Sequence, residues 1–228
     1  MTNINVVDVV ENKKVSGLSF FLLALCAFAG IATEMIHVLF TMPVIFGASG
    51  DDWTTAQSII HWIITCITWG FISLVLVRIA DRKFHFNMFA KSDKVKLWQW
   101  ITIVVGVVFT LAVSYKNWNG FKVVMEYHNN GWLLFIFQYI YYLFETALFT
   151  LIIVFGQKAF EIWFKKENFP YGGVLVALTW GLAHVLTKGS LQIGLFGALS
   201  GFLFGTAYLL VNRDIKKTFV ILFIMFII

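Results

Sequence analysis

Long runs of apolar residues, separated by short polar connections, set the main limit on how this chain can fold. Hydrophobic side chains make up 60% of the 228 residues and charged side chains 13%, whereas about 25% of a soluble protein is charged. A helix of about 20 apolar residues crosses the hydrocarbon core of a bilayer. The sequence therefore predicts an all-α, polytopic transmembrane bundle of about seven helices, forming one integral membrane domain over residues 1–228. The expected helices cover residues 17–46, 57–79, 97–114, 131–157, 171–187, 192–211 and 217–228.

The basic residues predict the orientation of this bundle. With the N-terminus in the cytoplasm, 14 of the 17 Lys and Arg residues fall on the cytoplasmic side, and Lys116, Lys122 and Lys188 fall outside. This imbalance is what the positive-inside rule predicts. Residues 1–16 then form a cytoplasmic segment. Because topology explains the net charge of +5, we expect a multi-pass protein of the cell (plasma) membrane whose partner is the lipid bilayer, with no nucleic acid.

Ionisable side chains within the apolar segments point to a functional site. Of the 12 acidic residues, Glu34 and Glu145 lie within predicted spans, and His37, His61 and His184 lie in or near the same spans. An ionisable group at the bilayer centre costs about 2.5–3.5 kcal/mol, so such groups usually face a protein interior or a wet cavity. Placing all five around one cavity would give a site of two carboxylates and three imidazoles.

Two short motifs follow one another on successive predicted helices. Tyr142-Leu-Phe-Glu-Thr-Ala-Leu-Phe149 carries a single glutamate, and Trp180-Gly-Leu-Ala-His184 precedes a glycine-rich run over residues 194–214. These segments resemble the Glu-Glu-x-x-x-Arg and Phe-x-x-x-His motifs of the CAAX protease and bacteriocin-processing (CPBP, or Abi) family of intramembrane endopeptidases. The family-like core covers residues 131–212. It differs from the family pattern in having one glutamate, no arginine, tryptophan in place of phenylalanine, and no third His-x-x-x-Asn motif.

The resemblance implies a bacterial intramembrane protease, a peptidase of the hydrolase class that cleaves a membrane-associated peptide or protein substrate. Glu145 would be the catalytic base that activates water, and His184 would orient the water or stabilise the oxyanion. Peptide hydrolysis needs such groups because water is a poor nucleophile at neutral pH. Trp180 would support the site. Asn212 is the nearest downstream amide, although it does not occupy the family position.

Other interpretations of these polar residues stay open. A catalytically silent family member would act as a membrane scaffold, an immunity protein or a regulator, with Glu145 a neutral structural acid. Glu34 and His37, three residues apart on one helix face, would form a structural pair. Alternatively, Glu34 replaces the missing catalytic partner, and His37 or His61 replaces the missing histidine. No cofactor or metal is expected; a divalent metal ion is the remaining alternative, because Glu-x-x-His is a ligand spacing but occurs here only once.

Two further features bear on packing. Gly197, Gly201 and Gly205 recur every four residues and predict a ridge of small residues that lets helices approach closely. Packing against the fourth and fifth predicted helices is the first expectation, and a homo-oligomer formed through this ridge is the second. Residues 117–131 are expected to form the longest outside connection, a polar re-entrant or surface loop.

Overall fold

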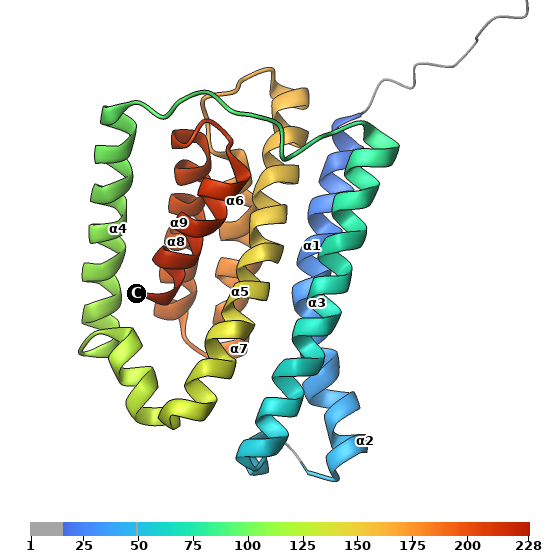
Figure 1. The fold of residues 1–228 in the computed structure, drawn as a ribbon, viewed down its shortest axis with the longest axis vertical. Helices are drawn as coiled ribbons and strands as arrows, with labels where there is room; N and C mark the ends of the chain where they lie inside the picture. The colour runs from blue at the N-terminus through green and yellow to red at the C-terminus, as the bar shows by residue number, and fades with distance from the viewer. Residues whose placement is uncertain (1–15, 49) are drawn as a thin grey trace, which may run out of the picture.

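The computed structural model describes residues 16–48 and 50–228, and every secondary-structure element in these ranges is helical (Figure 1). Residues 1–15, which include nearly all of the predicted cytoplasmic segment, lie outside the described residues. The described part contains seven continuous helical segments and a short 3-10 turn, η2 (Gly50–Asp52). The segments are α1–η1–α2 (Gly17–Ile36, His37–Thr41, Met42–Phe46), α3 (Thr55–Phe84), α4 (Leu97–Trp118), α5 (Lys122–Phe164), α6–η3–α7 (Tyr171–Val176, Ala177–Gly181, Leu182–Lys188), α8 (Leu191–Leu210) and α9 (Ile215–Ile227).

The prediction of an all-helical chain with membrane-spanning character is confirmed for the described residues. Five helical stretches are long and apolar enough to cross a membrane, by length and composition: 17–46, 55–84, 97–118, 122–164 and 191–210. Each of the seven predicted ranges falls on one helical segment. The main differences lie at the ends, because α3 continues to Phe84 and α4 to Trp118. Polar residues in those last turns concealed the continuation of the helices.

Side chains at the helix starts satisfy backbone N–H groups that have no partner within the helix. Thr54 and Gln57 form a reciprocal capping box at the start of α3. Ser190 caps α8, accepting a hydrogen bond from the Ile193 N–H. Asp214 caps α9, accepting from the N–H groups of Lys216 and Lys217. These local signals explain why the chain turns and begins a new helix at each of these points.

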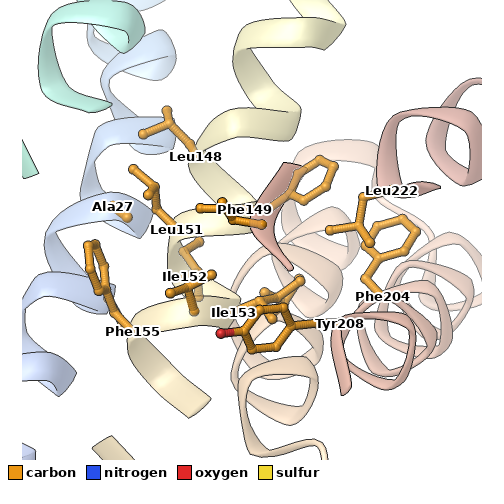
Figure 2. Close-up of a cluster of buried hydrophobic side chains, with 14 of the residues drawn as sticks. Ala27, Leu148, Phe149, Leu151, Ile152, Ile153, Phe155, Phe204, Tyr208 and Leu222 are labelled. Carbon is orange, nitrogen blue, oxygen red and sulfur yellow. The ribbon is translucent and has the colours of Figure 1, made fainter. Parts of the chain in front are cut away.

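Helix α5 occupies the middle of the bundle and contacts α1, α3, α6 and α9. Its residues from Leu148 to Phe155 are almost completely buried, as expected for a helix that is apolar on every side. Figure 2 shows Phe149 of this stretch near Phe204 of α8, and the two rings stack with centroids 5.2 Å apart. The candidate residue Glu145 lies one helical turn before this packed segment, so its backbone position is well fixed.

The prediction of a loop over residues 117–131 is wrong for most of that range. Residues 122–130 are helical and lead into the long part of α5 through a bend at Gly131, whose φ is 69° and ψ 170°. That backbone conformation is essentially restricted to glycine. Figure 1 shows the short first part of α5 running on beyond the end of α4 before the helix turns into the bundle. The polar sequence concealed this helix because the polar residues Lys122 and Glu126 face other parts of the protein.

The glycine ridge on α8 packs against α6–η3–α7 of the same chain. A Cβ atom built on Gly201 would lie 2.7 Å from the backbone nitrogen of Ala177, and one on Gly197 would lie 2.9 Å from the carbonyl oxygen of Gly181. Gly205 meets Gly173 in the same way. The predicted packing on the fifth helix is therefore present. Because the chain itself covers the ridge, a homo-oligomer would need another face.

Candidate active site

A cavity of about 1030 Å³ collects most of the candidate residues. We call it the polar cavity. It is lined by residues of α1, α3, α5, η3, α7 and α8, and also by the last residues of α4, by Ser190 between α7 and α8, and by Phe226 of α9. Its lining includes Glu34, Glu145, Trp180 and His184 among the predicted residues. His37, His61 and Asn212 do not line it.

Glu145 and Trp180 form a direct bond across two helices. The Trp180 indole Nε1–H donates to Glu145 Oε1 over 2.8 Å, and both side chains are buried, with the glutamate only 8% exposed. Trp180 lies in the π-helical turn η3. Such turns occur often at functional sites. The other carboxylate oxygen, Oε2, accepts no hydrogen bond from the described residues. It is therefore available to a molecule in the polar cavity.

His184 is held by the same tryptophan through its backbone. The Nδ1 atom lies 2.8 Å from the Trp180 carbonyl oxygen, which can only accept, so Nδ1 carries the proton in this bond. The neutral ring then presents an unprotonated Nε2. The imidazole also packs against the Trp180 ring, with centroids 4.6 Å apart and planes at 70°. Trp180 thus fixes the positions of both family-like catalytic candidates.

Glu34 reaches the polar cavity from α1. Its carboxylate lies 3.6 Å from His61 Nε2 and interacts with the Tyr141 side chain of α5. His61 is buried behind it, against the Trp53 ring at a centroid distance of 5.0 Å. Nδ1 of His61 has no hydrogen-bond partner among the described residues. His61 therefore contacts the cavity only through Glu34.

His37 does not form the predicted pair with Glu34. Its Nε2 lies 3.1 Å from Thr68 Oγ1 on α3, and its Nδ1 lies 3.4 Å from Thr41 Oγ1. Both ring nitrogens are thus taken up by threonine hydroxyls, and neither is left for the Glu34 carboxylate. His37 consequently links the end of α1 to α3 and does not line the polar cavity.

Asn212 lies at the opposite end of the bundle. Its Oδ1 accepts from Gln99 Nε2 over 2.8 Å, and its Nδ2 donates to the carbonyl oxygens of Asp93 and Lys94. These bonds hold the connection between α3 and α4 against the turn between α8 and α9. A supporting role for Asn212 at Glu145 is therefore wrong, because proximity along the sequence did not place it near the cavity.

Two residues of the polar cavity were missed by the sequence analysis, Lys122 and Glu126. Glu126 is 3% exposed and accepts hydrogen bonds from the hydroxyl groups of Tyr142 (2.7 Å) and Tyr139 (3.0 Å) and from Gln138 Nε2 (3.2 Å). Lys122 and Glu126 are four residues apart, as are Gln138 and Tyr142. This helical spacing is a signal for a helix, although the polar composition of residues 117–131 predicts a loop.

No group of three or more His, Cys, Asp or Glu side chains within residues 16–48 and 50–228 is arranged to hold a metal ion. The divalent-metal alternative therefore has no donor set in this part of the chain. Comparisons of the chain with protein-family models, with curated proteins and with solved structures give no match.

Proposed function

We propose that this chain is an intramembrane endopeptidase in which Glu145 activates a water molecule that cleaves a membrane-associated peptide or protein. The observation that carries the proposal is the Glu145–Trp180–His184 chain of hydrogen bonds on the wall of the polar cavity. The sequence resemblance to the CPBP family supports it independently. Buried ionisable groups in a cavity of an apolar bundle are also the usual mark of a functional site in a membrane.

The proposal includes an orientation, with the N-terminus in the cytoplasm and all seven helical segments embedded in the cell membrane. The connections rich in Lys and Arg, which include residues 85–96 and 165–166, lie at one end of the bundle (Figure 1). The turns between α4 and α5 and between α7 and α8 lie at the other end. The positive-inside rule assigns the first end to the cytoplasm. The polar cavity then opens toward the outside.

Each catalytic candidate has a distinct chemical role. Glu145 accepts a proton from water while the water oxygen bonds to the scissile carbonyl carbon, and the electron pair of the C=O bond moves to the carbonyl oxygen. The C=O bond then re-forms, the C–N bond breaks, and the proton held by Glu145 passes to the leaving nitrogen. His184 accepts a hydrogen bond from the water at Nε2 and orients it. The products are a carboxyl group and an amine.

A second candidate function is a catalytically silent membrane scaffold, immunity protein or regulator. The observation that favours it is that the arginine of the resembling motif would fall on Phe149 or Thr150, and both residues are buried. The Phe149 ring stacks on Phe204 and contacts Trp180. This position therefore contributes packing in place of a charge.

Cleavage of a pooled library of hydrophobic peptides by the purified protein in lipid nanodiscs separates the two functions. We expect Glu145→Gln and His184→Ala each to lower the cleavage rate by at least about 100-fold, because a positioned general base contributes about 100- to 10,000-fold. Glu167→Gln is the matched control, since that side chain is exposed and lies near Arg213, outside the polar cavity. Cleavage that survives both site substitutions would refute the proposed site. A wild-type protein that cleaves nothing in the pool would favour the silent function.

A further inference from the structure

The proposed peptidase leaves one catalytic requirement unassigned, a donor for the negative oxygen that forms during attack. Most donors close to Glu145 are already used. The Trp180 indole donates to Glu145, the His184 Nδ1–H donates to a backbone carbonyl, and the Tyr142 hydroxyl donates to Glu126. Gln138 donates to Tyr142 and Glu126. His184 in this tautomer offers the cavity an acceptor.

The Lys122 ammonium group is a candidate for this hydrogen-bond donor. An ammonium group has three N–H donors, and Lys122 Nζ donates one hydrogen bond, of 2.6 Å, to the backbone carbonyl of Phe226. The same nitrogen lies 5.0 Å from the centroid of the Tyr142 ring and 4.7 Å from that of Phe226, within the range of cation–π attraction. The carbonyl and the two rings hold the ammonium in place, and its other N–H groups have no hydrogen-bond partner within residues 16–48 and 50–228.

The position of Lys122 also fits the charge requirement. It lines the polar cavity together with Glu145 and His184, and it lines a smaller adjoining cavity of about 180 Å³ with Trp180 and His184. The bend at Gly131 brings this residue to the same cavity as Glu145, which follows it by 23 positions in the chain. A cation thus reaches the site from the helix preceding the family-like core.

Resting on the proposed peptidase function, we propose that Lys122 is a catalytic residue that stabilises the oxyanion. As the water oxygen bonds to the scissile carbon, the C=O electron pair moves to oxygen, and a Lys122 N–H donates a hydrogen bond to the resulting O⁻. The lysine keeps its proton through the step. When the C–N bond breaks, the oxygen regains its double bond and the hydrogen bond weakens.

The test uses a peptide that the wild-type protein cleaves, with the full chain in lipid nanodiscs. We expect Lys122→Met to lower kcat by about 100-fold or more with KM within about threefold of wild type, and Lys122→Arg to recover at least a tenth of wild-type kcat. Lys116→Met is the matched control, an exposed lysine at the same end of the bundle that lines neither cavity. Wild-type kcat in Lys122→Met would overturn the inference while leaving the peptidase function in place.

An inhibitor pair gives a readout that a purely structural lysine would not change. A phosphinic analogue of the same peptide carries a tetrahedral anion, and a ketomethylene analogue is neutral and trigonal. We expect Lys122→Met to weaken binding of the phosphinic analogue by about 100-fold and to leave the ketomethylene analogue within about threefold. Equal weakening of both analogues would assign Lys122 a packing role and overturn the inference. Absence of any wild-type cleavage would overturn both proposals.

Discussion

The indole nitrogen of Trp180 lies 2.8 Å from a carboxylate oxygen of Glu145, and joins two helices inside the bundle. A buried carboxyl group without a partner is costly, so this bond contributes to stability as well as to the site. In the motif that this segment resembles, the position holds phenylalanine, which has no side-chain N–H donor. This hydrogen bond therefore depends on the tryptophan.

Removing this bond should destabilise the fold in a way that depends on Glu145. We expect Trp180→Phe to lower the free energy of unfolding by about 1–3 kcal/mol in the wild-type background and by less in a Glu145→Leu background. Unfolding in detergent micelles with increasing denaturant, on the four proteins of the double-mutant cycle, measures the difference. Additive effects of the two substitutions would show that the bond contributes little.

The close contact between α6–η3–α7 and α8 predicts that a single methyl group at Gly201 is harmful. Its Cβ would lie 2.7 Å from the backbone nitrogen of Ala177, and backbone cannot move aside cheaply. We expect Gly201→Ala to lower the free energy of unfolding by about 1–3 kcal/mol. Gly106→Ala is the matched control, because nothing lies within 4 Å of its added Cβ; its stability should stay equal or rise by up to about 1 kcal/mol. Equal effects would contradict the packing described for the ridge.

Acid should loosen the turn between α8 and α9. Hydrogen bonds from the Lys217 side chain and backbone, and from Ser92, lower the pKa of Asp214 from 3.8 to about 2. A lowered pKa in the folded state means that the unfolded chain binds the proton more tightly. The stabilisation is therefore complete above about pH 4 and is lost as the pH falls toward 2.

The measurement for Asp214 is the unfolding midpoint between pH 5 and pH 2, compared with the variant Asp214→Asn. We expect the wild-type midpoint to fall more steeply with acid than the midpoint of the variant, which has no carboxylate to protonate at this position. Parallel pH profiles would show that Asp214 is not stabilised by these contacts.

The proposed orientation can be tested by cysteine labelling. In a background with Cys26→Ala and Cys66→Ala, we expect a membrane-impermeant maleimide to label the Gln192→Cys variant on intact cells and to leave the Lys91→Cys variant unlabelled. Both positions are exposed. Gln192 lies in the first turn of α8 and Lys91 in the connection between α3 and α4, and these two parts of the chain lie at opposite ends of the bundle (Figure 1). Both variants should react once the cells are opened. Labelling of Lys91→Cys alone on intact cells would place the polar cavity on the cytoplasmic side.

The helices could be predicted because length and hydrophobicity are local properties of the sequence. The candidate pair Glu145 and His184 could be found for a related reason, since an ionisable residue stands out in an apolar span. The ends of α3 and the first part of α5 could not be found in this way. Their polar residues indicate a connection unless the partners that bury them are known.

The partners of the polar residues were the least predictable feature. Glu126 is buried by tyrosines that follow it by 13 and 16 positions, and the bend at Gly131 brings them together. His37 bonds to Thr68 and Asn212 to Gln99, and both partners lie on other helices. Such pairings depend on tertiary packing. The sequence spacing therefore predicts the wrong partner for His37, namely the nearby Glu34.

The π-helical turn η3, Ala177–Gly181, has a consequence for how the site tolerates change in length. A π turn holds one residue more than the α-helical turn it replaces, and each residue of a helix advances about 100° around its axis. Deleting one residue there would make the helix more regular and locally more favourable. It would also rotate His184 and the rest of α7 by about 100° relative to α6, so a shorter chain would form a better helix and lose the candidate active site.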